Sequence, residues 1–296
     1  MVGVKIAPAS TRLTPPSDVK GVRIPERTLP LLRDLVHTHT GMFYDDSRLD
    51  VLTDRLVPLA MERGFDSLLD YYYLLKYDAA AATDWARVID NLSVQETYFW
   101  REFDQVRALV DVIVPRLVSL RRQTLRIWSL PCATGEEPLS LAMALTEAGW
   151  FDRIRIDIHA GDASEAALAR ARKGRYGLRS FRQLPEALRD KYFRQSDDDK
   201  REWVVNEELS ARVQSWTRIN AVQHAELAAL RGADVVFCRN MFIYFQESRV
   251  RQVVTDLAGL MSSPAHLCVG AAESLLRLTT AFELQDLAGA YVYVKS

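Results

Sequence analysis

Four short segments of this chain hold polar residues in arrangements that suit ligand chemistry. The first, residues 131–138, reads Pro-Cys-Ala-Thr-Gly-Glu-Glu-Pro and follows a short β-prone run. A strand, a tight glycine turn and a helix form the nucleotide-binding corner of doubly wound folds, where the helix start favours an anion. The segment lacks a Gly-x-Gly-x-x-Gly cradle, so it favours a ligand with a ribose and a carboxylate over a dinucleotide. A plain strand-to-helix turn is the alternative.

The second segment ends in Asp162, after an alternating apolar pattern over 154–160. A carboxylate at the carboxyl end of a strand can accept hydrogen bonds from both hydroxyls of a ribose. The alternative is that Asp162 caps the next helix, with Glu165 completing a capping box. The two roles are compatible.

The third segment, residues 234–245, reads Asp-Val-Val-Phe-Cys-Arg-Asn-Met-Phe-Ile-Tyr-Phe. It predicts a buried strand that ends in Arg239-Asn240, where open sheets bind ligands. Phe242 and Phe245 are expected in the core. The hydroxyl of Tyr244 must find a partner or reach the site.

The fourth segment, residues 91–101, sets polar residues and three consecutive aromatic residues in front of Arg101. One interpretation is that this segment, at the end of the preceding helical region, binds a ligand. The alternative is a helix–helix contact with a solvated arginine.

Hydrophobic periodicity divides the chain into two parts that would position these segments. From about residue 25 to 120 apolar residues recur at helical spacing, and no strand pattern precedes residue 124. The first third therefore predicts a small all-α domain at 23–120, after a loose arm at 1–22 that is rich in Pro, Ser, Thr and Gly.

From 121 to 296 strands alternate with helices, which predicts an α/β domain with a doubly wound, mostly parallel sheet. The expected strands are 125–130, 154–160, 213–219, 233–237, 267–271 and 291–294, and the helices among them are 136–148, 164–173 and 247–260. Residues 175–208 interrupt the alternation with a helical piece at 185–192 and a short strand at 203–205, which indicates an inserted subdomain.

Composition excludes several classes of protein. Hydrophobic residues make up 48% and charged residues 26% of the 296 residues, as in ordinary globular proteins. Lys+Arg 38 against Asp+Glu 39 gives a net charge of -1, so there is no global basic field for nucleic acid. No apolar run reaches the roughly 18 residues of a membrane span, and the N-terminus lacks the apolar core of a signal peptide.

Cysteine and histidine usage argues against disulfides and metals. Cys132, Cys238 and Cys268 are odd in number and far apart, which favours reduced thiols in a cytoplasmic protein. The five histidines do not cluster at metal-ligand spacing, so no metal site is predicted. Nothing in the sequence demands more than a monomer.

Together and in this order, the segments resemble the CheR family of chemotaxis receptor glutamate methyltransferases. The family pattern Thr-x-Phe-Phe-Arg appears here as Thr-Tyr-Phe-Trp-Arg at 97–101. The pattern Trp-Ser, five residues, then Gly-Glu-Glu-Pro-Tyr-Ser is matched at 128–140, and an Asp after the second strand is matched by Asp162. The remaining matches are Lys/Arg-x-Gly-x-Tyr at 172–176, Phe-Cys-Arg-Asn at 237–240 and Ile-Tyr-Phe at 243–245. The resemblance covers nearly the whole chain from about residue 25.

The resemblance implies S-adenosylmethionine as cofactor and a receptor glutamate as methyl acceptor. It implies an N-terminal helical domain and a Rossmann-like methyltransferase domain with a small inserted β subdomain at 181–213, which in some members docks a peptide from the receptor's C-terminus. Carried over residue by residue, the implied cofactor contacts are Gln95, Thr97, Arg101, Glu137, Asp162, Asn220, Ala221, Arg239 and Asn240. The implied partner is the cytoplasmic helical region of a receptor, with no nucleic acid and no insertion into the membrane.

Two positions depart from the family pattern. Gln95 stands where an Asn is common, which keeps the amide but lengthens its reach. Leu139 stands where a Tyr is common and lacks the hydroxyl. Neither change removes a charged position.

The expected reaction is an in-line methyl transfer to a carboxylate oxygen. Since a glutamate with a pKa of roughly 4.3 is already ionised near neutral pH, no general base is required. The expected catalytic residues are Arg101, which would hold the carboxylate of the cofactor or of the acceptor by a forked contact, and Tyr244, which would steer the acceptor oxygen. Asp162 would bind ribose, and Glu137 would lie near the ribose or the amino-acid portion.

Three other functions remain open at this stage. One is a methyltransferase for RNA, DNA or a small molecule; Arg-Asn-Met-Phe at 239–242 lacks the prolines of the Asn/Asp-Pro-Pro-Tyr pattern of nucleic-acid amino-group methyltransferases. The second is a non-catalytic relative that binds the cofactor or the receptor as a scaffold, against which the retained Arg101, Asp162 and Asn240 argue. The third is a partner-binding helical domain that the α/β domain merely supports.

Overall fold

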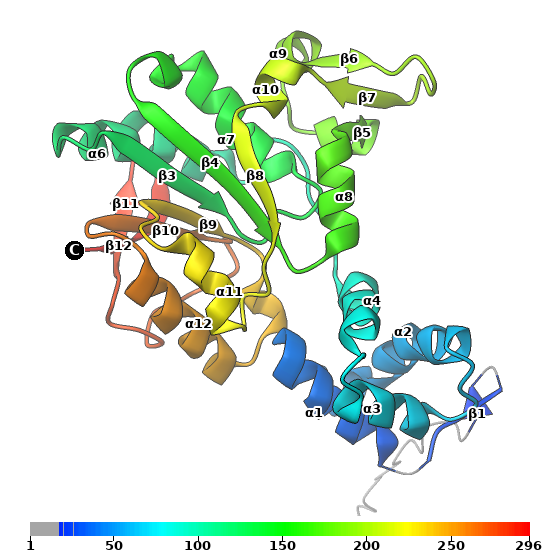
Figure 1. Cartoon of the computed structure of the whole chain (residues 1–296). Coiled ribbons are helices and arrows are strands. Elements are labelled where there is room, and N and C mark those ends of the chain that lie inside the picture. The colour runs from blue at the N-terminus through cyan, green and yellow to red at the C-terminus, as the bar shows by residue number, and fades with distance from the viewer. Residues whose placement is uncertain (1–17, 20, 26) are drawn as a thin grey trace, which may run out of the picture. The chain divides into compact units, whose positions relative to one another are not determined.

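The computed structural model describes residues 18–19, 21–25 and 27–296, and these form two compact units (Figure 1). The first unit holds the described residues up to Leu35 together with Tyr44–Trp85, and the second holds Val36–Phe43 and Ala86–Ser296. Most of the predicted arm, residues 1–17 and 20, lies outside the described residues. No helix in the described ranges is both long enough and apolar enough to span a bilayer.

The first unit is helical, as the periodicity predicts. Its core includes Leu32, Leu52, Leu56 and Tyr71, which are fully buried. Its elements are α1 (Thr28–Thr40, whose last turn belongs to the second unit), η1 (Asp46–Arg48), α2 (Leu49–Glu62), α3 (Leu68–Tyr77) and α4 (Ala82–Leu92, whose second half belongs to the second unit).

A short hairpin precedes α1, with strands β1 (Asp18–Val19) and β2 (Val22–Arg23). This hairpin is the one strand pairing in the described residues ahead of 124, where the sequence shows no strand pattern. Strands of two residues are too short to produce an alternating apolar pattern.

The second unit is built on a seven-stranded sheet with the order β11-β12-β10-β9-β3-β4-β8. The five strands from β10 to β8 are parallel, and β12 and β11 continue the sheet antiparallel. The prediction of a mostly parallel, doubly wound sheet is confirmed. The strands are β3 (Thr124–Ser129), β4 (Arg155–Asp162), β8 (Val213–Arg218), β9 (Val235–Cys238), β10 (Ala265–Val269), β11 (Glu283–Leu287) and β12 (Ala290–Lys295).

Helices cover both faces of this sheet (Figure 1). Val235 and Phe237 of β9 pack into one apolar cluster and Val236 and Cys238 into another, because successive strand residues point to opposite faces. The first cluster includes α5 (Phe103–Ala108), a π-helical stretch (Leu109–Ile113), α6 (Val114–Ser119) and α7 (Glu136–Glu147). The second includes α11 (His224–Leu227), η5 (Ala228–Leu230) and α12 (Glu247–Leu260).

An inserted subdomain follows α8 (Glu165–Lys173). Phe181 of the subdomain stacks on Phe99, which comes from the segment before α5, with ring centroids 5.2 Å apart. Phe193 of the subdomain packs on both rings. Its antiparallel sheet has the order β5-β7-β6 and begins at Arg175, ahead of the expected 181–213 range. Its elements are β5 (Arg175–Gly177), η4 (Leu178–Phe181), α9 (Glu186–Tyr192), β6 (Phe193–Gln195), β7 (Glu202–Val205) and α10 (Glu207–Ser210).

The strand order places the switch point of the large sheet beside β3. From β3 the chain builds β4 and β8 on one side and then crosses to β9 and β10 on the other. The loops after β3 and β9 therefore diverge at their carboxyl ends, where open α/β sheets bind ligands.

Candidate functional site

A cavity opens at the carboxyl ends of β3, β4, β8 and β9, and all of its lining residues belong to the second unit. Its empty space, with the open mouth included, is about 670 Å³. Six residues singled out in the sequence line it: Gln95, Asp162, Asn220, Ala221, Asn240 and Tyr244. Leu130, Ile219, Met241 and Phe245 add apolar walls.

Asp162, the last residue of β4, anchors the loop after β3. Its Oδ2 accepts the N–H of Ala133 at 2.8 Å and its Oδ1 accepts the N–H of Ser164 at 2.9 Å. Burial raises the pKa of Asp162, and the N–H donors of Ser164 and Ala133 oppose that rise. The carboxylate thus lies at the cavity wall with lone pairs left for hydroxyl donors.

The interpretation of Asp162 as a helix cap is wrong. Ser164 caps α8, since its Oγ accepts the N–H of Ala167 at 3.0 Å. Glu165 pairs with Arg172 and does not complete a capping box with Asp162. The carboxylate of Asp162 therefore lies at the cavity wall without acting as the N-cap of α8.

Gly135 forms the tight turn between β3 and α7 at φ +99°. A Cβ there would lie 2.9 Å from the hydroxyl of Tyr176 and 3.0 Å from the ring of Trp216. The turn therefore requires glycine for its backbone conformation and for its lack of a side chain.

Gly135→Ala is expected to lower the free energy of unfolding by about 2 kcal/mol, through backbone strain and the two contacts. Thermal unfolding measures this. Gly259→Ala is the matched control, because Gly259 lies in α12 with open space around it, and alanine there is expected to raise stability by up to about 1 kcal/mol. Equal melting temperatures for the two variants would contradict the claim that the turn at position 135 requires glycine.

Asn220 joins the end of β8 to the last turn of α1. Its Nδ2 donates to the carbonyl of His39 at 2.7 Å, and its backbone N–H donates to Glu226 at 2.7 Å. Gly41 packs in the same region against Phe245, where a Cβ would come within 2.6 Å of the ring. This side of the cavity is thus closed by residues 36–43 of the same unit.

Asn240 follows β9 in the left-handed conformation, with φ +59°. Asparagine tolerates this region better than most residues. Its Nδ2 lies 3.4 Å from Oε1 of Glu102. The short helix η6 (Phe242–Tyr244) comes next, and the carbonyl of Tyr244 accepts the N–H of Phe43 at 2.9 Å.

Gln95 lies at the cavity wall beside the start of α8. Its Nε2 donates to the hydroxyl of Ser164 at 3.3 Å, and its Oε1 accepts from Arg170 at 3.3 Å. The hydroxyl of Ser164 in turn donates to Asp90 at 2.7 Å. The side chain of Gln95, which is longer than the asparagine common at this position, thus reaches the hydroxyl of Ser164.

Four residues singled out in the sequence do not line the cavity: Thr97, Arg101, Glu137 and Arg239. The Nη1 of Arg101 donates to the carbonyl of Glu96 at 2.8 Å. The Nε of Arg239 donates to Oε2 of Glu137 at 2.6 Å, and both side chains are buried. Burial opposes the charge of Arg239, and Glu137 raises its pKa.

The Glu137–Arg239 pair connects four parts of the second unit. Glu137 lies in the first turn of α7 and its Oε1 accepts from Ser129 at the end of β3 at 2.6 Å. Arg239 follows β9, and its Nη1 donates to the carbonyl of Arg101 at 2.9 Å. The pair therefore fixes the backbone at 101 against the ends of both strands that flank the switch point.

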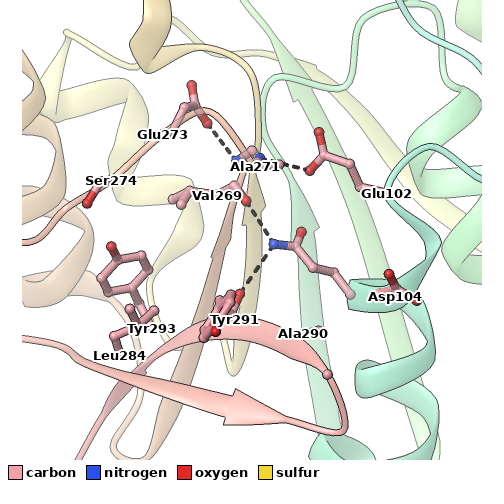
Figure 2. A pocket seen from close by; sticks show the side chains of 13 residues that line it. Glu102, Asp104, Val269, Ala271, Glu273, Ser274, Leu284, Ala290, Tyr291 and Tyr293 are labelled. Atoms are coloured by element: carbon pink, nitrogen blue, oxygen red, sulfur yellow. Dashed lines mark hydrogen bonds between the residues drawn. The ribbon is translucent and has the colours of Figure 1, made fainter.

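A second cavity lies between α5 and the ends of β10 and β12 (Figure 2). Its empty space, mouth included, is about 840 Å³, and its walls include Glu102, Gln105, Glu273 and Tyr291. Figure 2 shows Glu102 and Glu273 approaching the backbone around Ala271 from opposite sides. Sequence reasoning missed this cavity and its two glutamates, and the only signal for Glu273 was an acidic residue after the expected strand 267–271.

The donor set of the first cavity fits a nucleoside ligand better than a metal ion. Asp162 offers acceptors for a ribose diol, and Leu130, Ile219 and Phe245 offer apolar surface for a flat base. In the described part of the chain no group of three or more His, Cys, Asp and Glu side chains is arranged to hold a metal. The second cavity, walled by three carboxylates (Glu102, Asp104 and Glu273), suits a nucleoside carrying an acidic group less well.

Comparison with known proteins identifies the family. Residues 27–93 match the family model described as the CheR methyltransferase all-alpha domain, and residues 95–290 match that of the CheR methyltransferase SAM binding domain. Chemotaxis protein methyltransferase 2 of Vibrio cholerae is 31% identical over 89% of this chain and 91% of its own.

Two further relatives show the range of the similarity. The chemotaxis protein methyltransferase of Salmonella typhimurium is 27% identical over 88% of each chain. The probable biofilm formation methyltransferase WspC of Pseudomonas putida is 32% identical over 78% of this chain and 53% of its own. The chain thus belongs to the CheR family of methyltransferases, and its cofactor is S-adenosylmethionine.

Proposed function

We propose that this protein transfers methyl groups from S-adenosylmethionine to glutamate side-chain carboxylates of chemotaxis receptors and forms glutamate methyl esters. The observation that carries the proposal is the cavity at the switch point, with Asp162 at its wall. The names of the chemotaxis relatives support the receptor as acceptor.

When bound, the cofactor supplies an electrophilic methyl group on a sulfonium centre. We propose that Asp162 holds the ribose and that Asn220 and Ala221 lie beside the base. Gln95 and Asn240 would contact the remaining polar groups of the cofactor at the wall. Since the acceptor glutamate is already ionised, the residues of the site need only orient it, exclude water and balance charge.

We propose that the four predicted site residues that do not line the cavity still contribute to cofactor binding; they are Thr97, Arg101, Glu137 and Arg239. Glu137 and Arg239 would act by fixing the backbone that carries Thr97 and Arg101, because their own side chains bind each other. A contact of Arg101 with a carboxylate of the cofactor or of the acceptor remains a prediction. Such a contact would compete with the hydrogen bond from Arg101 to the carbonyl of Glu96.

Tyr244→Phe is expected to lower kcat about tenfold while leaving cofactor affinity within about twofold, since one hydroxyl contact made by the acceptor oxygen is lost. Steady-state kinetics with varied acceptor measures both parameters. Tyr291→Phe is the matched control, because Tyr291 is exposed and lines the second cavity only. An unchanged kcat in Tyr244→Phe would remove Tyr244 from the proposed catalytic residues.

We also propose which parts of the chain form its domains and what each does. Of the expected domains, 23–120 would be the helical and 121–296 the catalytic domain, with the stretch from residue 95 to 120 joining the catalytic domain, because the match to the SAM binding domain begins at residue 95. The insertion at 181–213 would dock a C-terminal receptor peptide. The protein would act in the cytoplasm as a monomer on the helical region of the receptor. The similarity to a biofilm formation methyltransferase makes a receptor outside chemotaxis the second candidate.

The test is transfer of a labelled methyl group from S-adenosylmethionine to receptor cytoplasmic fragments. The proposal predicts label on the receptor that mild base releases as methanol, and no label on a fragment whose acceptor glutamates are changed to alanine. Label that mild base does not release, or label on RNA, DNA or a small molecule, would show that the methyl acceptor is not a receptor glutamate. Cofactor binding with no transfer to any acceptor would favour a scaffold.

A further inference from the structure

Glu273 is a partly buried carboxylate that accepts four backbone N–H groups. It lies in the turn after β10, and burial raises its pKa against the opposing effect of these donors. Its Oε2 accepts from Gly270 at 2.7 Å and from Asn240 at 2.8 Å. Its Oε1 accepts from Phe242 at 2.6 Å and from Ile243 at 3.2 Å. Figure 2 shows the side chain turned toward the backbone around Ala271.

Three of these four donors belong to the segment after β9 that lines the first cavity. Asn240, Met241 and Tyr244 of this segment are wall residues. The segment leaves the sheet through the left-handed conformation at Asn240. Its N–H groups therefore have no ladder partner at this point, and Glu273 supplies the acceptors that the sheet does not.

Gly270 shows how closely the two strand ends are joined. A Cβ at this position would lie 2.5 Å from Nδ2 and 3.0 Å from the backbone N of Asn240. It would also lie 3.0 Å from Oε2 of Glu273. The turn after β10 therefore lies directly against the backbone after β9, with Glu273 bonded to both.

We propose that Glu273 is a positioning residue for cofactor binding, because its carboxylate fixes the backbone of residues 240–243 and with it the place of Asn240 and Met241 in the cavity wall. This inference rests on the assignment of the first cavity to S-adenosylmethionine. It needs no assumption about the methyl acceptor.

The amide isostere provides a sharp test of this role. Each carboxylate oxygen accepts two N–H groups, so either orientation of a glutamine places its NH₂ against two donors. Glu273→Gln keeps the size of the side chain and loses half of the acceptors. The backbone of 240–243 must then shift or leave two N–H groups without partners.

The experiment measures the affinity of the purified full chain for S-adenosylhomocysteine by calorimetry. Glu273→Gln is expected to weaken binding about tenfold or more. Glu283→Gln is the control for charge, because Glu283 is an exposed residue of β11. Val254→Ala is the control for lost stability, because Val254 is fully buried in α12 and does not line the cavity. Both controls are expected to bind within about twofold of the wild type at a temperature where all variants are folded.

A positioning role also predicts coupling to Asn240. In the background of Asn240→Ala, the added effect of Glu273→Gln on the dissociation constant is expected to be smaller than in the wild type, since Asn240, one of the two wall residues that Glu273 places, has lost its side chain. A purely structural role would lower stability by the same amount in both backgrounds and leave affinity unchanged.

Affinity within twofold of the wild type in folded Glu273→Gln, or equal weakening in Val254→Ala, would overturn the proposal. If Glu273→Gln does not fold, Glu273→Asp is judged by the same criterion, because its shorter side chain keeps the charge and cannot reach all four N–H groups. Failure of the proposed glutamate methylation would leave this result standing. Absence of binding to the wild type would instead remove the cofactor site itself.

Discussion

Asp162→Ala is expected to weaken the binding of S-adenosylhomocysteine by about 100-fold or more. The substitution removes the carboxylate that would accept hydrogen bonds from the ribose hydroxyls. It also removes the acceptor of the Ala133 N–H and so frees the loop after β3, which forms part of the cavity wall. Two charge-assisted hydrogen bonds, each of about 1.5 kcal/mol or more, account for this factor.

Calorimetric titration measures this effect, with a check by circular dichroism that the variant is folded. Glu165→Ala is the control, because Glu165 is an exposed carboxylate of α8 that pairs with Arg172. Its affinity is expected to match that of the wild type. A folded Asp162→Ala protein that binds within about threefold of the wild type would show that Asp162 does not hold the ribose.

Glu137→Ala is expected to lower the free energy of unfolding by about 3–5 kcal/mol, because it removes the carboxylate bonded to the buried guanidinium of Arg239 and leaves only that of Glu102, 3.9 Å from Nη1. The Arg239 side chain is only 3% exposed, so water cannot replace the lost carboxylate. The Ser129 hydroxyl loses its acceptor in the same step. Urea denaturation measures the change.

We expect the lost free energy of unfolding to come from the buried charge of Arg239. Removing that charge as well tests this. Glu137→Leu combined with Arg239→Met is expected to be more stable than Glu137→Leu alone, since no charge is then left in the core. Glu247→Ala, which breaks the exposed pair with Arg251, is the control and is expected to cost less than about 1 kcal/mol. Equal costs in Glu137→Ala and Glu247→Ala would contradict the account of the buried pair.

The architecture of the second unit could be predicted because local patterns determine it. Helix α12 runs from Glu247 to Leu260, as the 3.6-residue periodicity predicts. Strand β11 (Glu283–Leu287) was missed, because it is a partly exposed edge strand in which charged residues interrupt the apolar pattern. The interruption of the α/β pattern at residue 175 was predicted, but strand β5 (Arg175–Gly177) was not, since a three-residue strand carries little periodicity.

The cavity wall could be anticipated from the ends of strands. Asp162 is the last residue of β4 and Asn240 follows β9, and the carboxyl ends of parallel strands meet at the same edge of a sheet. The identity of the cofactor was not available from this argument and came from the family resemblance.

The contacts behind the wall could not be predicted because they join residues that are distant in the sequence. Glu137 and Arg239 are 102 positions apart, and nothing local marks either as a partner of the other. Glu273 binds backbone N–H groups, which every residue carries, so no residue type identifies its partners. Side chains that hold backbone in place are thus the part of this site that only the structure reveals.

The most direct test of the cofactor site is a crystal structure of the protein with S-adenosylhomocysteine. We predict the ribose hydroxyls at Asp162 and the adenine beside Asn220 and Ala221, in the cavity at the ends of β3, β4, β8 and β9. Density for the ligand in the second cavity, between Glu102 and Tyr291, would contradict this prediction.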